Sequence, residues 1–218
     1  LHMAYGLSDG FRYKIIVTFS DLKAREIFED YQFYDREVTW YPAKDLIFYQ
    51  ADIHGNQLVT ERMKALRKII EGKPQTVITT FAALMSPQVP LEEIAASVIH
   101  IDADSSLNEG ELARKLAEMG YEKNYQVDAP GQFSIRGGII DIFDLTEENP
   151  YRIELWGEEV ESIRSFDLLS QRSVEKLNEV DIYPATEMML SEEQKEKGLR
   201  RIEKEAKEFE EKLRSSFL

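Results

Sequence analysis

The chain has 218 residues, of which 43% are hydrophobic and 31% charged, with a formal net charge of −14 and no cysteine. This length suits one large domain or two small ones. The acidity argues against a broad nucleic-acid-binding surface, and without cysteine there can be no disulfide, thiolate metal site or cysteine nucleophile. No apolar run approaches membrane-spanning length and no secretory signal pattern opens the chain, so we expect a cytoplasmic protein.

The first hundred residues alternate between short apolar runs and helical patterns. Strands are predicted over residues 14–18, 37–43, 76–80 and 97–101. Helices are predicted over residues 20–31, with Ser20 as N-cap, and 58–73, ending at Gly72, and a short helical turn follows residue 80. Strands that alternate with helices indicate a parallel sheet with helices on its faces, so the chain opens as an α/β unit with its strands buried.

The pattern of predicted helices and strands changes after about residue 103. One amphipathic helix is predicted over residues 107–121. Strands without long helices between them then follow, over residues 125–129, 132–136, 139–143, 151–156, 162–167 and 179–185. Strands at such short spacing indicate an antiparallel sheet, and therefore a small α+β unit.

The last segment, residues 191–214, is predicted to be one long helix. Ser191 and Gln194 have the spacing of a capping box. Apolar residues spaced by three and four form a single stripe, made of Leu199, Ile202, Ala206, Phe209 and Leu213. Such a stripe is typical of a helix packed on its own domain, and a coiled coil or an inter-domain stalk is the alternative.

The motifs of common catalytic and cofactor sites are absent. Gly6 and Gly10 resemble the start of a phosphate-binding loop, but no Gly-Lys-Ser/Thr follows them. The run that begins at Asp102 lacks the glycine and the glutamate that a calcium loop needs. The three histidines are too far apart for zinc-ligand spacing. We therefore expect no catalytic residue, no metal site and no cofactor in this chain.

Alternation of side chains along the strands draws attention to one exposed face. In the run 151–156, Arg152 and Trp156 point away from the core face, and in the run 132–136 Arg136 does the same. Gly137 and Gly138 can take positive φ, so either a tight hairpin or a glycine bulge follows Arg136.

If these strands share one sheet, Arg136, Arg152 and Trp156 lie on its outer face. Arginine and tryptophan are enriched at protein–protein hot spots, and arginine binds carboxylates through two parallel bonds. The alternative is that both arginines pair with local acids while Trp156 packs against the neighbouring domain. The pattern alone does not separate the two.

The same residues carry a family resemblance. The runs "GQFSIRGGIIDIF", "PYRIEL" and "DLLSQRS" resemble the UvrB-homology module of the bacterial transcription-repair coupling factor, Mfd, most densely over residues 119–188. The repair protein UvrB shares the general pattern, but it usually has Arg-Gly-Asp where this chain has Arg136-Gly137-Gly138.

The resemblance implies a fold and a domain order. Residues 1–102 would be domain 1a, a degenerate helicase-like parallel-sheet domain of the P-loop NTPase type. Residues 103–183 would be domain 2, an inserted small α+β domain with an antiparallel sheet, and residues 184–218 the start of domain 1b. In this family the phosphate-binding loop is degenerate, which agrees with its absence here.

The resemblance also implies a function. Domain 2 of the family binds UvrA, the damage-recognition ATPase, through two arginines and an aromatic residue that match Arg136, Arg152 and Trp156; the family aromatic is commonly Phe. The chain would be a monomeric recruitment module without catalysis, serving transcription-coupled nucleotide excision repair. RNA polymerase, DNA, ATP and Mg would be bound only by other domains of the full-length protein. The alternative is the N-terminal part of a UvrB-like ATPase that binds damaged DNA.

Overall fold

The structure is a computed structural model that describes residues 1–8, 10–44, 54–187 and 192–216. The chain divides into two compact units, residues 1–187 and residues 188–218. The larger unit is mixed α/β, with one three-stranded parallel sheet, one six-stranded sheet that is antiparallel but for one edge strand, and one two-stranded antiparallel ribbon.

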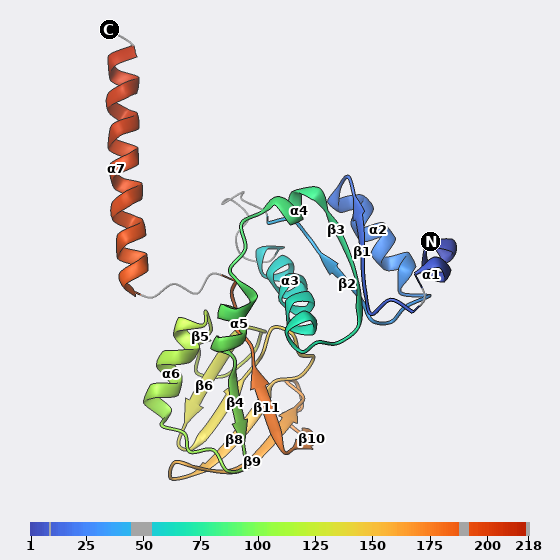
Figure 1. The fold of residues 1–218 in the computed structure, drawn as a ribbon. Helices are drawn as coiled ribbons and strands as arrows, with labels where there is room; N and C mark the ends of the chain where they lie inside the picture. The colour runs from blue at the N-terminus through green and yellow to red at the C-terminus, as the bar shows by residue number, and fades with distance from the viewer. Residues whose placement is uncertain (9, 45–53, 188–191, 217–218) are drawn as a thin grey trace. The chain divides into compact units, whose positions relative to one another are not determined.

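The parallel sheet and its helices occupy the first part of the larger unit (Figure 1). The strand order is β1-β3-β2, with bounds β1 (Tyr13–Thr18), β2 (Val38–Tyr41) and β3 (Gln75–Thr80). The helices are α1 (His2–Leu7), α2 (Asp21–Tyr31), α3 (His54–Ile70) and α4 (Phe81–Met85). The hydroxyl of Ser20 accepts a hydrogen bond from the backbone N–H of Lys23 at 3.3 Å, which confirms the predicted N-cap of α2.

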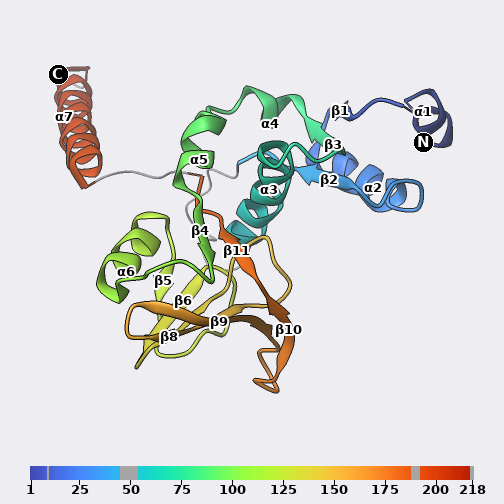
Figure 2. The ribbon, with the colours of Figure 1, turned by 60° about the horizontal axis from the view of Figure 1, so that its bottom comes forward.

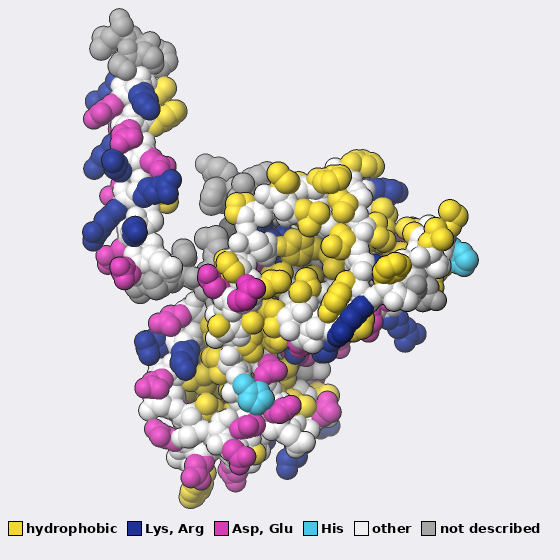
Figure 3. All heavy atoms as spheres, viewed as in Figure 1, with side chains coloured by type: hydrophobic (Ala, Val, Ile, Leu, Met, Phe, Trp, Pro, Cys, Tyr) yellow, Lys and Arg dark blue, Asp and Glu magenta, His cyan; other side chains and the backbone are white. Residues whose placement is uncertain are grey.

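The two faces of this sheet are covered unequally. On one face Ala24 and Tyr31 of α2 pack with Trp40 and Ile78. On the other face β1 is largely uncovered, and the side chain of Ile15 is 64% exposed. Figure 3 shows hydrophobic side chains gathered over α4 and the strands beside it. The strand predicted over residues 14–18 is thus confirmed, but its predicted burial is wrong because one face of β1 is left uncovered, with Tyr13, Ile15 and Val17 exposed.

The fourth predicted strand does not join the parallel sheet. It forms as β4 (Ile99–Asp102), but it pairs antiparallel with β11 (Glu179–Ile182). An unpredicted helix, α5 (Leu91–Ser97), comes directly before it. A short apolar strand reads alike in parallel and antiparallel sheets, so its partner cannot be deduced from the run itself.

The six-stranded sheet has the order β10-β9-β8-β7-β6-β5 (Figure 2). Its strands are β5 (Glu122–Lys123), β6 (Gln132–Arg136), β7 (Ile139–Ile142), β8 (Tyr151–Trp156), β9 (Glu159–Phe166) and β10 (Ser173–Leu177). Helix α6 (Glu109–Glu118) precedes them, and the Asn108 side chain caps it by accepting from two backbone N–H groups. The strand predicted over residues 125–129 is wrong, since β5 forms earlier, and β10 was not predicted.

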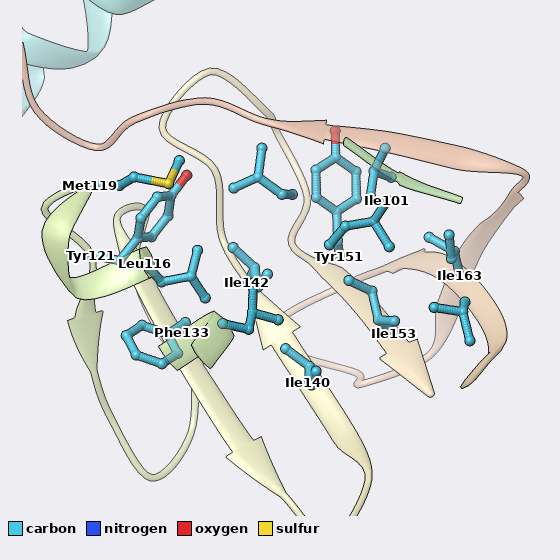
Figure 4. Packing of buried hydrophobic residues seen from close by; sticks show 14 residues of the cluster. Ile101, Leu116, Met119, Tyr121, Phe133, Ile140, Ile142, Tyr151, Ile153 and Ile163 are labelled. Carbon is cyan, nitrogen blue, oxygen red and sulfur yellow. The ribbon is translucent and has the colours of Figure 1, made fainter. Parts of the chain in front are cut away.

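One apolar core lies on the inner face of this sheet. Leu116 and Met119, at the C-terminal end of α6, belong to one cluster with side chains from β6, β7, β8 and β9 (Figure 4). The strand residues include Phe133, Ile140, Ile142, Ile153 and Ile163. Val180 and Ile182 of β11 belong to the same cluster, so the ribbon formed with β4 completes this core. Since the inner face is filled, the opposite face of β6, β7 and β8 is the one left for a partner.

The smaller unit contains one long helix, α7 (Glu192–Ser216), which confirms the predicted helix. Ser191, its predicted N-cap, lies outside the described residues. The packing of the apolar stripe of α7 on its own domain stays a prediction. In the part of the chain that the structure describes, no helix has both the length and the apolar character of a membrane span.

The β4–β11 ribbon carries a pH-sensitive cluster. His100 Nδ1 lies 2.7 Å from Asp181 Oδ1, and its Nε2 lies 3.7 Å from Asp102 and 3.8 Å from Glu179. The hydrogen bond to Asp181, reinforced by the three carboxylate charges, raises the pKa of His100. A raised folded-state pKa stabilises the fold below the unfolded value of about 6.5, and that stabilisation is lost as the pH rises through the raised pKa.

We therefore expect His100→Gln to lower the melting temperature at about pH 5 and to leave it nearly unchanged at about pH 9. Scanning calorimetry of the wild type and the variant across this pH range measures the difference in melting temperature. Groups that titrate equally in both proteins do not contribute to that difference. A difference that stays constant with pH would refute the assigned role of the imidazolium.

Candidate partner-binding site

A tight hairpin places the first predicted arginine. Strands β6 and β7 pair antiparallel with Arg136 opposite Ile139, so only Gly137 and Gly138 form the turn. Their φ angles are 57° and 83°, and positive φ at both central residues is what a type I′ turn requires. The hairpin is confirmed and the glycine bulge is not formed. Arg136 is thereby fixed as the last residue of β6.

Strand register brings the second arginine to the same face. Asp141 of β7 lies opposite Ser134 on one side and opposite Arg152 of β8 on the other. Residues directly opposite in an antiparallel pair share a face, and Arg136 is two residues beyond Ser134. The prediction that Arg136 and Arg152 are co-facial is therefore confirmed.

A buried aspartate holds both guanidinium groups. Asp141 is 1% exposed. Arg152 donates from Nε to Asp141 Oδ1 at 2.6 Å and from Nη2 to Oδ2 at 2.8 Å, while Arg136 Nη2 donates to Oδ2 at 3.2 Å. Bidentate bonds of this kind fix the guanidinium plane as well as its position. Among the described residues, Nη1 of each arginine has no hydrogen-bond partner, so both arginines keep donors for an external carboxylate.

Neighbouring side chains support each arginine from a second direction. The guanidinium carbon of Arg152 lies 4.2 Å from the ring centre of Phe166, and its Nη2 also donates to Gln171 Oε1 at 3.0 Å. The guanidinium of Arg136 lies 5.4 Å from the ring centre of Tyr125. The side chain of Arg152 is 14% exposed and that of Arg136 is 37% exposed. Arg152 is thus the more rigid and Arg136 the more accessible of the two.

Trp156 lies near the hairpin end of the same face. It follows Arg152 by four residues on β8, so alternation places it on the same side, and Leu155 between them packs against the core. Its side chain is 79% exposed. Burial of an indole on association removes a large apolar area from water, which makes Trp156 a suitable anchor.

Basic residues continue from Arg152 across the sheet. Arg164 of β9 lies opposite Arg152, and Lys176 of β10 lies opposite Arg164. Like charges directly opposite one another disfavour the sheet. Such a row therefore favours acidic groups beside it, either from the chain itself or from a partner, even though the whole chain is strongly acidic.

One acid of the chain partly compensates this row. Arg164 donates to both carboxylate oxygens of Glu154, at 2.7 and 2.8 Å. These hydrogen bonds, with one from Ser162, lower the pKa of Glu154 to about 2. Arg164 is therefore engaged within the sheet, whereas Arg136 and Arg152 share the single carboxylate of Asp141. The arginine pair therefore keeps a net positive charge.

The sequence left open an alternative in which both arginines pair with local acids and Trp156 packs against the neighbouring domain, and only its first part is confirmed. Both arginines do pair with a local acid, Asp141, but Trp156 is exposed and packs against no described residue of the neighbouring domain. The sequence reasoning missed Asp141, although alternation along residues 139–143 already placed it on the face of Arg136. It also missed Gln171, although this residue lies in the run "DLLSQRS" that carries the family resemblance.

The chemistry of this arrangement is recognition. It presents fixed hydrogen-bond donors and an apolar anchor, which suit a carboxylate beside an apolar pocket. Within the described ranges, no three His, Asp or Glu side chains are placed to hold a metal ion. A face with these residue types suits contact with another protein.

Comparison with known proteins shows the family to which the chain is similar. Residues 99–188 match the family model described as "UvrB interaction domain". The chain is similar to the transcription-repair-coupling factor of Bacillus subtilis, with 39% identity over 169 residues, which is 78% of the chain. It is also similar to those of Staphylococcus aureus (36% over 163 residues, 74% of the chain) and Myxococcus xanthus (35% over 153 residues, 70% of the chain).

The chain therefore corresponds to the N-terminal UvrB-homology module of the transcription-repair-coupling factors. It spans 14% of the length of the Bacillus and Staphylococcus proteins and 13% of the Myxococcus protein. The family is one of DNA repair.

Proposed function

We propose that this chain is a recruitment module that binds UvrA and so couples transcription to nucleotide excision repair. The observation that carries the proposal is the pair of guanidinium groups, Arg136 and Arg152, held side by side by the buried Asp141 on the face that also exposes Trp156. The three residues that the resemblance matches to the UvrA contact are thus available together. The guanidinium groups engage carboxylates of UvrA, and Trp156 enters an apolar pocket.

The remaining parts of the proposal concern the rest of the chain. Residues 1–98 form a degenerate helicase-like domain, and residues 184–218 the start of a further domain. The UvrA-binding domain begins with β4, and not at residue 103 as predicted from the sequence, because β4 pairs with β11 and Ile101 belongs to the core of the six-stranded sheet. The module carries out no catalysis and needs no cofactor. RNA polymerase and DNA are bound by parts of the full-length protein outside this chain, where ATP and Mg also act.

The test is a binding measurement with purified UvrA at increasing salt. We expect one-to-one binding whose affinity falls at least about threefold between about 50 and 300 mM NaCl, because exposed charge pairs are screened. Titration of the same chain with ATP and with DNA separates the alternative, a UvrB-like ATPase. Binding of ATP with no binding of UvrA would overturn the proposal.

A further inference from the structure

The loop between β9 and β10 is a turn that is closed by internal hydrogen bonds. It runs over residues 167–172 and extends beyond the sheet (Figure 2). Its ends are joined by the bond from Asp167 N–H to the Arg172 carbonyl, at 2.9 Å. The Asp167 carboxylate also accepts from the backbone and the hydroxyl of Ser170, at 2.8 and 2.7 Å. These internal bonds fix the loop's shape.

Gln171 connects this loop to the arginine pair. Its Oε1 accepts from Arg152 Nη2 at 3.0 Å, and its Nε2 donates to the carbonyl of Leu168 at 2.8 Å. Gln171 has φ 57°, the left-handed region, which among the described non-glycine residues is found here alone. A glutamine persists in this conformation only when its surroundings compensate for the strain, and such outliers gather at functional sites.

The loop also presents an apolar side chain to solvent. Leu169, two residues before Gln171, is 97% exposed. A single exposed leucine needs no explanation on an ordinary surface. Here it stands on a rigid turn that is hydrogen-bonded to the proposed binding arginine, so it is pre-organised for contact with whatever binds Arg152.

We propose that the loop of residues 167–172 is a second part of the partner-binding surface, with Gln171 as a positioning residue for Arg152 and Leu169 as an apolar contact. The inference rests on the proposed function, and its occupant is the same acidic partner. Gln171 and Asp141 approach the Arg152 guanidinium from two elements, and among the described residues none accepts from its Nη1, which is the donor offered to the partner. Leu169 widens the apolar contact beyond Trp156.

Gln171→Gly tests the positioning role. Glycine adopts positive φ without strain, so we expect a melting temperature that is unchanged or higher, together with an affinity for UvrA about fivefold lower. In an Arg152→Lys background no guanidinium remains to be oriented, and the same change should have no further effect. A purely structural residue would instead lower stability in both backgrounds.

Leu169→Ser tests the contact role. We expect an affinity about fivefold lower, in either background, at unchanged stability. Leu22→Ser, which alters an exposed leucine of α2, is the matched control and should bind as the wild type does. Wild-type affinity of both Gln171→Gly and Leu169→Ser would overturn the inference. If the unmodified chain fails to bind UvrA at all, the proposed function itself is wrong.

Discussion

Arg152→Ala is expected to lower the affinity for UvrA by at least about 30-fold, enough to remove UvrA from a pull-down. Truncating one partner of a desolvated, hydrogen-bonded charge contact costs about 2–5 kcal/mol of binding free energy. Arg152 is the arginine fixed from three directions, by Asp141, Phe166 and Gln171, so it loses little freedom on binding. Calorimetry with purified UvrA measures the change.

The same substitution should also weaken the fold. From the sequence alone, Arg152 is a surface residue whose removal leaves the melting temperature unchanged. In the structure its removal leaves the buried Asp141 with one bond from Arg136, and an under-compensated buried carboxylate costs about 1–3 kcal/mol. We therefore expect a lower melting temperature for Arg152→Ala.

A second variant separates binding from stability. Asp141→Asn combined with Arg152→Ala removes the uncompensated charge, so its stability should recover in part while UvrA binding stays lost. Arg164→Ala is the matched control, because Arg164 lies opposite Arg152 but is engaged by Glu154, and it should change the affinity about threefold at most. Recovery of wild-type binding in the double variant would show that Arg152 acts on the fold and not on UvrA.

Local pattern predicted most elements of the fold. Alternating and apolar runs predicted β1, β2, β3 and the central strands, and the hydroxyl of Ser20 predicted the start of α2. Pairing was not predictable in the same way. Strand β4 pairs with β11, nearly eighty positions later, and nothing within either run specifies that partner. Strand β10 is polar and largely exposed, so it has no apolar alternation to detect.

The candidate site likewise combines features that follow from local sequence with features that depend on pairing between distant segments. The co-facial placement of Arg136 and Arg152 follows from the period of two along a strand and from the Gly137-Gly138 turn, both of which are local. That they converge on one carboxylate depends on register between β7 and β8. The contact of Arg152 with Gln171 joins a strand to a loop nineteen positions later, and only the folded chain brings the two together.

Trp156→Ala is expected to lower the affinity for UvrA by at least about 30-fold without changing stability. Loss of a central aromatic anchor costs about 2 kcal/mol or more of binding free energy, whereas a side chain that is 79% exposed contributes little to the fold. Trp156→Phe keeps a flat apolar ring, so we expect less than about a fivefold loss. Calorimetry measures the affinities, and thermal unfolding checks the stability.

The fluorescence of the indole provides an independent measurement of the same contact. The chain has two tryptophans, and Trp40 is buried, so the solvent-exposed component of the fluorescence belongs to Trp156. Its emission should shift to shorter wavelength when UvrA covers it, and the shift should be absent in Trp156→Phe. Phe33→Ala, which alters an exposed aromatic residue following α2, is the control and should bind normally. Full binding by Trp156→Ala, with an unshifted emission in the wild-type complex, would show that Trp156 is not the apolar anchor of this face.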